Sequence, residues 1–181
     1  MSTYFDTGPI PEEFKSFETG EAFQRCSVCN ADLMVEGAHY FIEKAFRKEE
    51  TVFEYAMCMD CFQKMREQLS VKSRQLIEHY FDEHVDIEAR RKTLIEKYGQ
   101  RARSWISNCM IRHTPFSDCN EYQIYGWFIG KDIVYNGMPY MLSGDVIDEL
   151  FNLLSSETTG VLDDFSEKLF GIDVPKGVIL I

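Results

Sequence analysis

Two Cys-x-x-Cys pairs are the residues of this chain whose types and spacing most clearly indicate chemistry. The first pair lies in CSVCN and the second in CMDCF, with 28 residues between them. Zn²⁺ prefers four soft or borderline ligands in a tetrahedron, and each Cys-x-x-Cys turn presents two thiolates to one side of such a site. The sequence therefore predicts one structural Zn²⁺ site, with the ligands Cys26, Cys29, Cys58 and Cys61.

The residues around each pair indicate how the backbone would present the thiolates. Asn30 follows the first pair directly, and Asn is one of the few residues besides Gly that tolerate the positive φ of a tight turn. The second pair continues into FQKMREQLS, which is rich in helix formers. We therefore expect Cys58 and Cys61 in the first turn of a helix, where backbone N–H groups and the helix dipole favour anionic thiolates.

The segment between the pairs predicts a β-hairpin. Residues 38–46, AHYFIEKAF, and 51–57, TVFEYAM, are rich in β-branched and aromatic residues, and polar residues separate them. A metal-binding turn, a hairpin and a helix that carries the second pair resemble the treble-clef zinc finger, over residues 21–69. The resemblance is at superfamily level and implies a fold, since treble clefs serve in nucleic-acid binding, protein binding and nuclease catalysis.

A metal would contribute strongly to the stability of such a small segment. Structural Zn²⁺ sites bind with about 10 to 16 kcal/mol of apparent free energy, against about 5 to 15 kcal/mol for the stability of a whole domain. About fifty residues with one hairpin and one helix bury too small a core to fold alone. We expect the metal to fold this segment.

A structural zinc site is favoured over three alternative roles for the cysteine pairs. A rubredoxin-like iron site would have a glycine after each pair, where this chain has Asn30 and Phe62. A thioredoxin-like redox pair would follow a strand in a βαβ unit and would need no second pair. The third alternative is four buried cysteines without a metal.

Two weaker groups of residues could also carry chemistry. Cys109, His113 and Cys119 lie close together in the sequence, but their spacing matches no metal site that we can justify, and free cysteines are often simply buried. His39 lies on the expected hairpin, where a treble-clef nuclease would carry its general base. No further His or Asn ligand lies near it in the sequence, so an ordinary strand histidine is the favoured interpretation.

The composition limits the classes of partner. The chain has 181 residues, 45% of them hydrophobic, and a net charge of −11, so it can bury a core and repels polyanions over most of its surface. The N-terminus lacks a secretory pattern, and no apolar run is long enough to span a membrane. We therefore expect a cytoplasmic protein, where paired cysteines are more often metal or redox groups than disulfides.

One segment departs from the acidic average. Residues 87–112 carry a net charge of +5, and helical periodicity predicts a helix over 87–105 with Arg90, Lys97 and Arg101 along one edge. Such a face could contact phosphates. A solvated face, or ion pairs with the acidic C-terminal segment, accounts for it better.

The chain as a whole is expected to be α+β, in four segments. These are an irregular arm (1–20), the treble-clef-like zinc module (21–69), a helical pair that bends near Val85 and Asp86 (70–107), and a C-terminal segment of short antiparallel strands followed by two helices (108–181). No internal repeat is visible in the sequence. The apolar tail GVILI could add a strand or cover a second copy, so a homodimer is one expectation.

These observations favour a non-enzymatic function. A complete set of four ligands leaves no open metal position, and no catalytic group of residues stands out. The leading hypothesis is a zinc-stabilised intracellular binding or regulatory protein whose partner is another protein, with no membrane contact. The alternatives are a metal-dependent hydrolase or nuclease of treble-clef type, and nucleic-acid binding through the basic helix 90–103.

Overall fold

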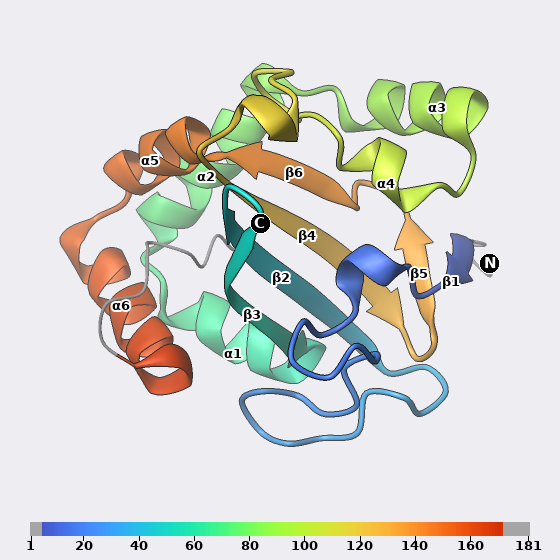
Figure 1. Cartoon of the computed structure of the whole chain (residues 1–181). Helices are drawn as coiled ribbons and strands as arrows, with labels where there is room; N and C mark the ends of the chain where they lie inside the picture. The colour runs from blue at the N-terminus through green and yellow to red at the C-terminus, as the bar shows by residue number, and fades with distance from the viewer. Residues whose placement is uncertain (1–4, 172–181) are drawn as a thin grey trace.

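A computed structural model describes residues 5–171 as a mixed α+β fold (Figure 1). Within these residues, six strands form one antiparallel sheet and six α-helices pack around it. The predicted α+β class is confirmed at this level. The strands are β1 (Asp6–Pro9), β2 (His39–Arg47), β3 (Glu50–Cys58), β4 (Glu121–Ile129), β5 (Asp132–Tyr135) and β6 (Tyr140–Ser143). The helices are α1 (Met59–Gln68), α2 (Val71–His84), α3 (Ile87–Tyr98), α4 (Ala102–Trp105), α5 (Gly144–Leu153) and α6 (Ser156–Phe170).

The sheet joins the N-terminal and C-terminal parts of the chain. Its strand order is β1-β5-β4-β2-β3, and β6 pairs with β4. Strands β2 and β3 form the hairpin that their β-branched and aromatic residues predict. β2 also pairs with β4 along its whole length, from His39 opposite Ile129 to Arg47 opposite Glu121. The segment with the four cysteines thus shares one sheet with the C-terminal segment.

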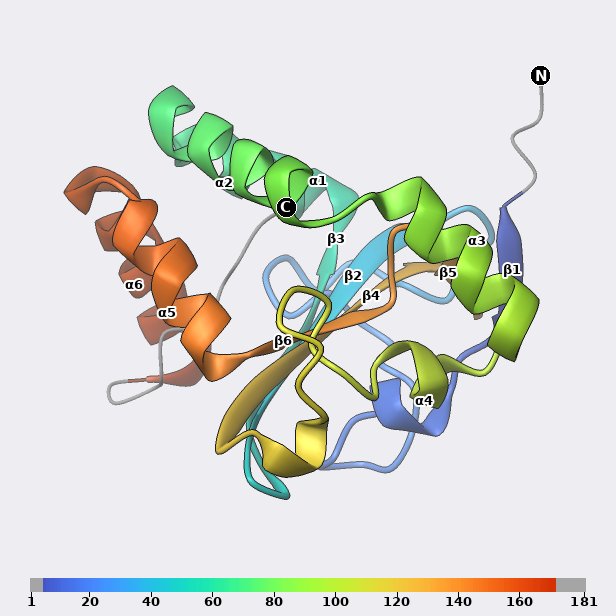
Figure 2. The same ribbon diagram turned by 90° about the horizontal axis from the view of Figure 1, so that it is seen from above.

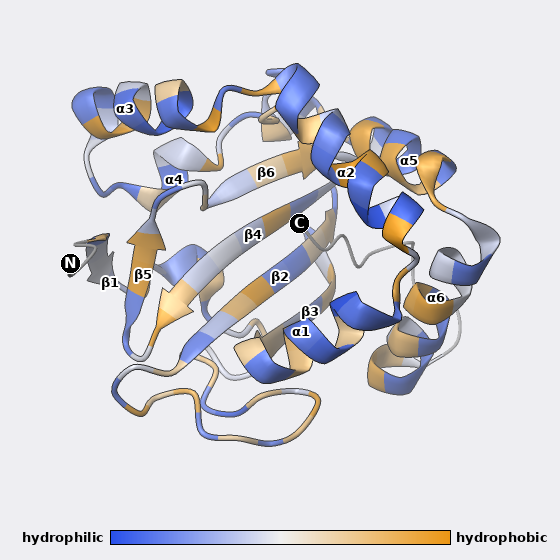
Figure 3. Cartoon of the chain, turned by 180° about the vertical axis from the view of Figure 1, so that it is seen from behind, coloured by the Kyte–Doolittle hydropathy of each residue, from blue (hydrophilic) through white to orange (hydrophobic). Residues whose placement is uncertain are grey.

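Each face of the sheet is covered by different elements. Figure 2, seen from above, places α1 and α2 on one side and the N-terminal segment with α4 on the other, and Figure 3 shows α1 and α2 from behind. On the first side, the Phe41 ring of β2 lies 4.7 Å from the Phe62 ring of α1. On the other side, Phe14 packs 5.3 Å from Phe128. A Cβ at Gly126 would come within 2.9 Å of Phe14, so this contact requires a glycine in β4.

The central helices differ from the prediction in one respect. Helix α2 ends at His84, and Asp86 caps α3 by accepting a hydrogen bond from the Ala89 N–H at 2.9 Å, which explains the expected bend. Helix α3 ends at Tyr98 because Gly99 adopts a φ of 57°, a conformation that favours glycine. The expected continuous helix 87–105, with its basic stretch 90–103, is therefore wrong. Arg101 and Arg103 belong to the separate, short α4 region.

The N-terminal segment is more regular than expected. Residues 6–9 form β1, which pairs with β5, and a 3₁₀ turn follows at Glu12–Phe14. Phe14 is buried, whereas Phe17 is 75% exposed. Residues 1–4 and 172–181 lie outside the described part of the chain. They include the GVILI tail, for which an added strand or a contact with a second copy is the expectation.

Among the described residues, no helix has both the length and the apolar character needed to cross a membrane.

Candidate metal centre

The four predicted ligand sulfurs lie together. The Sγ atoms of Cys26, Cys29, Cys58 and Cys61 are all within 4.8 Å of one another, and those of Cys29 and Cys58 are 3.7 Å apart. Sulfurs bound to one Zn²⁺ at about 2.3 Å in a tetrahedron lie roughly 3.8 Å apart. The donor atoms are therefore already spaced for one tetrahedral ion.

A tight turn presents the first pair. The Cys26 N–H donates to the Ala31 carbonyl at 2.9 Å, and the Asn30 N–H donates to the Cys26 carbonyl at the same distance. Asn30 has a φ of 63°, the positive value expected at this position, which Asn adopts more readily than most residues. The turn places Cys26 in the interior and leaves Cys29 exposed.

The end of a strand and the start of a helix present the second pair. Cys58 is the last residue of β3 and the N-cap of α1, and Cys61 lies in the first turn of that helix. Both positions agree with the prediction. One backbone hydrogen bond connects the two pairs directly, because the Cys58 N–H donates to the Cys26 Sγ at 3.4 Å.

The electrostatic setting differs among the four thiols. Burial alone would raise the pKa of Cys26, but hydrogen bonds from backbone N–H groups, including those of Cys58 and Val28, lower it overall. Burial and the neighbouring thiols raise the pKa of Cys58 and of Cys61. Four thiolates so close together repel one another, and a divalent cation would compensate that charge.

The arrangement argues against a redox pair. Four converging thiols from two turns are typical of a structural metal site, whereas a redox centre needs two. The cysteine cluster thus supports metal binding, with Cys26 and Cys61 on its buried side.

The weaker candidate group, Cys109, His113 and Cys119, does not converge, in agreement with the interpretation that it forms no metal site. Cys109 is buried, Cys119 is half-buried and donates to the Pro115 carbonyl at 3.4 Å, and His113 lies on the surface. Within residues 5–171, the four-cysteine cluster is the one group of three or more His, Cys, Asp or Glu side chains close enough to share an ion. Cys109 instead accepts hydrogen bonds from Ser143.

His39 lies on β2, as expected. Its Nδ1 accepts a hydrogen bond from the Trp127 indole N–H at 3.2 Å, which ties the ring to the neighbouring strand. The described chain brings no second metal-ligating side chain into a cluster with it. This environment is that of an ordinary strand histidine.

Two cations of the basic segment make contacts within the protein. The Arg90 guanidinium donates to the carbonyls of Gly137, Trp105 and Pro139 at 3.0 to 3.1 Å, and burial lowers its pKa to about 10. Arg91 pairs with Asp6 of β1 at 2.7 Å. Arg90 thus joins α3 to α4 and to the loop between β5 and β6, and Arg91 joins α3 to β1.

Sequence reasoning missed a buried acid. Glu43 of β2 lies between Tyr55 and Tyr125 on the adjacent strands, and Tyr55 donates a hydrogen bond to its Oε2. Complete burial raises the pKa of Glu43 well above its usual range, which favours the neutral carboxyl group. The sequence does show a charged residue within an apolar strand. Such a residue is as typical of a bulge or of an edge strand as of a buried polar group, so it did not identify Glu43.

Comparisons with models of protein families, with curated proteins and with solved structures gave no match for this chain. The site must therefore be interpreted from its own geometry.

Proposed function

We propose that this protein is a zinc-stabilised intracellular binding or regulatory protein that acts through contact with another protein. The observation that carries the proposal is the closed group of four cysteine sulfurs within 4.8 Å of one another. Four protein ligands complete a tetrahedron and leave no position for a substrate or a catalytic water. The ion, once bound, fixes the turn 26–31 to the first turn of α1.

The order of elements around the cysteines supports a treble-clef assignment for residues 21–69. A turn carries Cys26 and Cys29, the hairpin of β2 and β3 follows, and α1 begins at the second pair. We propose this fold for the segment on that order. Thiolate ligands persist in reducing compartments, which supports the intracellular location.

Three exposed apolar side chains in the N-terminal part of the chain support a protein partner. Phe17, Val28 and Val35 are 75%, 47% and 51% exposed. Val28 lies within the cysteine turn itself, between Cys26 and Cys29. Exposed apolar groups on a rigid turn offer contact area to another protein at little entropic cost.

A capture experiment from native cells tests the proposal. The triple variant Phe17→Ser/Val28→Ser/Val35→Ser should keep its metal and its thermal midpoint but lose the protein that crosslinks to the wild type. The matched control Val71→Ser/Leu153→Ser changes exposed apolar residues of α2 and α5 instead, and should retain the partner. A partner that both variants capture equally well would contradict this surface, and a folded protein without bound metal would contradict the proposal as a whole.

A further inference from the structure

A turn in the C-terminal half repeats the backbone of the cysteine turn. The Cys109 N–H donates to the Thr114 carbonyl and the His113 N–H donates to the Cys109 carbonyl, both at 2.8 Å. His113 has a φ of 59°. Residues 109–114 thus reproduce the hydrogen bonds and the left-handed fifth residue of the turn 26–31, displaced by 83 positions. An antiparallel bridge flanks each turn at the same offset, Arg25 to Asp32 and Asn108 to Pro115.

Both turns attach to the sheet in the same way. The residue after the first cysteine of each turn donates its N–H to a strand carbonyl at 2.8 Å. These bonds run from Ser27 to Ala56 of β3 and from Met110 to Met141 of β6. In both cases the acceptor lies two residues before a helix N-cap.

The sulfur of each turn also accepts the same hydrogen bond. The Cys58 N–H donates to the Cys26 Sγ at 3.4 Å, and the Ser143 N–H donates to the Cys109 Sγ at 3.4 Å. Cys58 and Ser143 are the N-caps of α1 and α5. Ser143 therefore occupies the position of Cys58, 85 residues later.

The helices that follow are equivalent as well. α1 and α5 each have 10 residues, and the N-caps of α2 and α6, Ser70 and Ser155, are again 85 positions apart. The Ser70 N–H donates to Thr158 Oγ1 at 3.0 Å, and the Ser155 N–H donates to Ser73 Oγ at 2.9 Å. The two hydroxyls Ser70 Oγ and Ser155 Oγ meet at 3.2 Å. Reciprocal contacts of this kind are expected where an approximate twofold axis relates two copies.

The strand register places the same axis in the sheet. β2 and β4 pair antiparallel, with Glu43 opposite Tyr125. Glu43 lies opposite Tyr55 on its other side, and Tyr125 lies opposite Tyr140. A twofold axis between Glu43 and Tyr125 therefore exchanges the β2–β3 pair with the β4–β6 pair.

We infer that the C-terminal half contains a second copy of the turn, strand pair and two helices that surround the four cysteines. This second copy has lost its metal site. The four positions equivalent to Cys26, Cys29, Cys58 and Cys61 hold Cys109, Arg112, Ser143 and Val146. One thiol, a guanidinium, a hydroxyl and an alkyl group cannot coordinate a zinc ion between them. The first copy holds the chain's one metal, and the second copy holds none.

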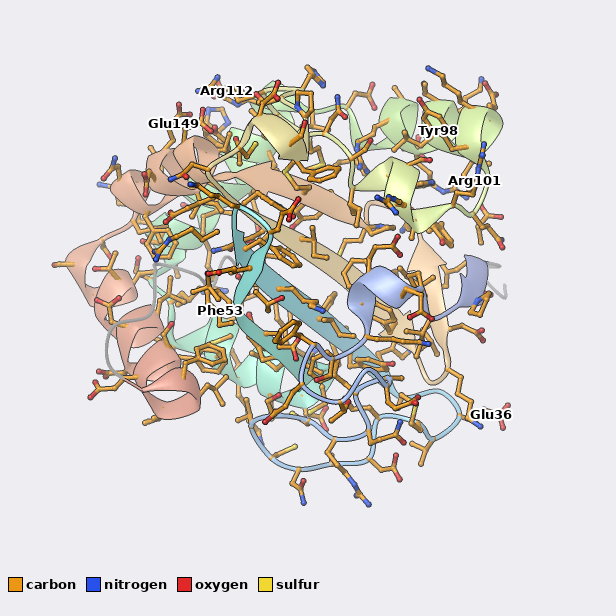
Figure 4. All side chains as sticks on the ribbon, in the orientation of Figure 1. Glu36, Phe53, Tyr98, Arg101, Arg112 and Glu149 are labelled. Carbon is orange, nitrogen blue, oxygen red and sulfur yellow. The ribbon has the colours of Figure 1, made fainter. Side chains whose placement is uncertain are left out.

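Ordinary side-chain contacts connect the second turn to its helix. The Ser143 hydroxyl donates to the Cys109 Sγ at 3.3 Å, and Val146 is buried. Arg112, exposed like Cys29, reaches α5, where it pairs with Glu149 and with Asp145 at 3.7 Å. Figure 4 shows Arg112 and Glu149 side by side. Together these contacts join the turn to the helix, as a metal would.

Restoring the missing ligands tests the inference. The variant Arg112→Cys/Ser143→Cys/Val146→Cys places four thiols at the second site together with the native Cys109. We expect it to bind two Co²⁺ ions per chain where the wild type binds one, with doubled thiolate-to-cobalt absorbance. The matched control adds Cys109→Ser to the same three changes and should lose the strong second absorbance.

A milder variant covers the case in which the triple variant does not fold. Arg112→Cys/Ser143→Cys keeps the buried Val146; the change at Arg112 is exposed and the change at Ser143 is nearly isosteric. With Cys109, this variant has three thiols at the second site, and it should bind a second Co²⁺ ion at a higher Co²⁺ concentration. Folded variants that bind no ion beyond the wild-type stoichiometry would overturn the inference, as would a wild type with two ions. If the wild type binds none and the triple variant binds one, the duplication stands and the proposed zinc function fails.

Discussion

The two copies of the turn, strand pair and helix differ in what holds them together. In the first copy, four thiols face one another within 4.8 Å, and in our proposal an ion bound by them joins the turn to the helix. In the second, a buried valine, a serine hydroxyl and a surface arginine make that connection. The comparison teaches that one backbone arrangement can be held by a metal or by packing, provided that the sheet between the copies is shared.

The shared sheet explains why the second copy could lose its metal. β2 and β4 pair along nine residues each, and α2 packs against α5. A copy fixed to a stable neighbour buries apolar surface that an isolated unit of about fifty residues would leave exposed. The shared sheet supports both copies, so one of them can hold its turn in place without a metal.

The largest expected effect comes from removing one ligand of the first copy. Cys61→Ser should abolish tight metal binding and lose much of the stabilisation that the ion contributes, which is roughly 10 to 16 kcal/mol in an isolated zinc finger. The turn 26–31 should then separate from α1, while β2 and β3 stay in the sheet. Cys109→Ser, the matched change in the second copy, should cost only about 1 to 2 kcal/mol. Thermal unfolding with and without a chelator measures both. Equal destabilisation by the two changes would contradict the assignment of the metal to the first copy.

The serine and threonine contacts at the twofold axis should show matched effects. Ser73→Ala leaves the Ser155 N–H without its acceptor, and Thr158→Ala does the same to the Ser70 N–H. Each should cost about 1 to 3 kcal/mol, since a partly buried donor loses its partner. Urea denaturation measures both, with Thr158→Ser as the control that keeps the hydroxyl. Costs that differ widely between the two positions would count against the symmetry.

Glu43 and Tyr125, which face each other at the twofold axis, should contribute differently to the pH dependence of stability. Because the folded-state pKa of Glu43 is raised above its unfolded value, the folded state holds a proton that the unfolded state releases. The stability contributed by this group is therefore complete below about pH 4.5 and falls as the pH rises towards the folded pKa, by at most about 1.4 kcal/mol per pH unit.

Glu43→Gln should remove this part of the pH dependence, whereas Tyr125→Phe should leave it largely in place. Denaturant midpoints measured from pH 5 to pH 8 distinguish the two variants. The free energies of unfolding of the wild type and of Glu43→Gln are compared at each pH. If their difference stays constant over this range, the carboxyl group does not retain its proton on folding.

The smallest expected effect is at Arg112, which occupies in the second copy the position of the exposed ligand Cys29. Arg112→Ala removes surface ion pairs with Glu149 and Asp145 and should lower the free energy of unfolding only slightly, by an amount that decreases with added salt. Cys29→Ala, at the equivalent exposed position of the first copy, should instead remove a metal ligand. Chemical denaturation at low and high salt compares them, and an Arg112→Ala cost as large as that of Cys29→Ala would contradict the difference between the copies.

The cysteine cluster could be predicted from the sequence because its chemistry is visible in residue types. Two pairs at three-residue spacing, Asn30 after the first pair and helix formers after the second are local signals. The hairpin likewise followed from the apolar and aromatic residues of β2 and β3. Each of these features depends on neighbours in the chain and needs no knowledge of tertiary contacts.

The second copy could not be found in the same way. Its offset from the first is 83 positions at the turn, 82 at Glu43 and Tyr125, and 85 at the helices, so no single shift aligns the two. Its ligand positions have also changed from thiols to other groups. What is repeated is the pattern of backbone hydrogen bonds, which many side chains allow.

The broken basic helix was missed for a related reason. Periodicity placed Arg90, Lys97 and Arg101 on one continuous face, but Gly99 ends α3 with a positive φ. A single glycine within a helical pattern is often tolerated, so the sequence did not indicate the break. The three carbonyls that receive the Arg90 hydrogen bonds come from residues 15 to 49 positions away.

Counting the metal in the wild-type chain tests the central claim most directly. Elemental analysis of protein purified without added metal, together with the absorbance after Co²⁺ exchange, should give one zinc per chain and a tetrahedral four-thiolate spectrum that Cys109→Ser leaves unchanged. A folded chain that contains no metal, or whose Cys26, Cys29, Cys58 and Cys61 thiols all react freely with an alkylating reagent, would contradict it.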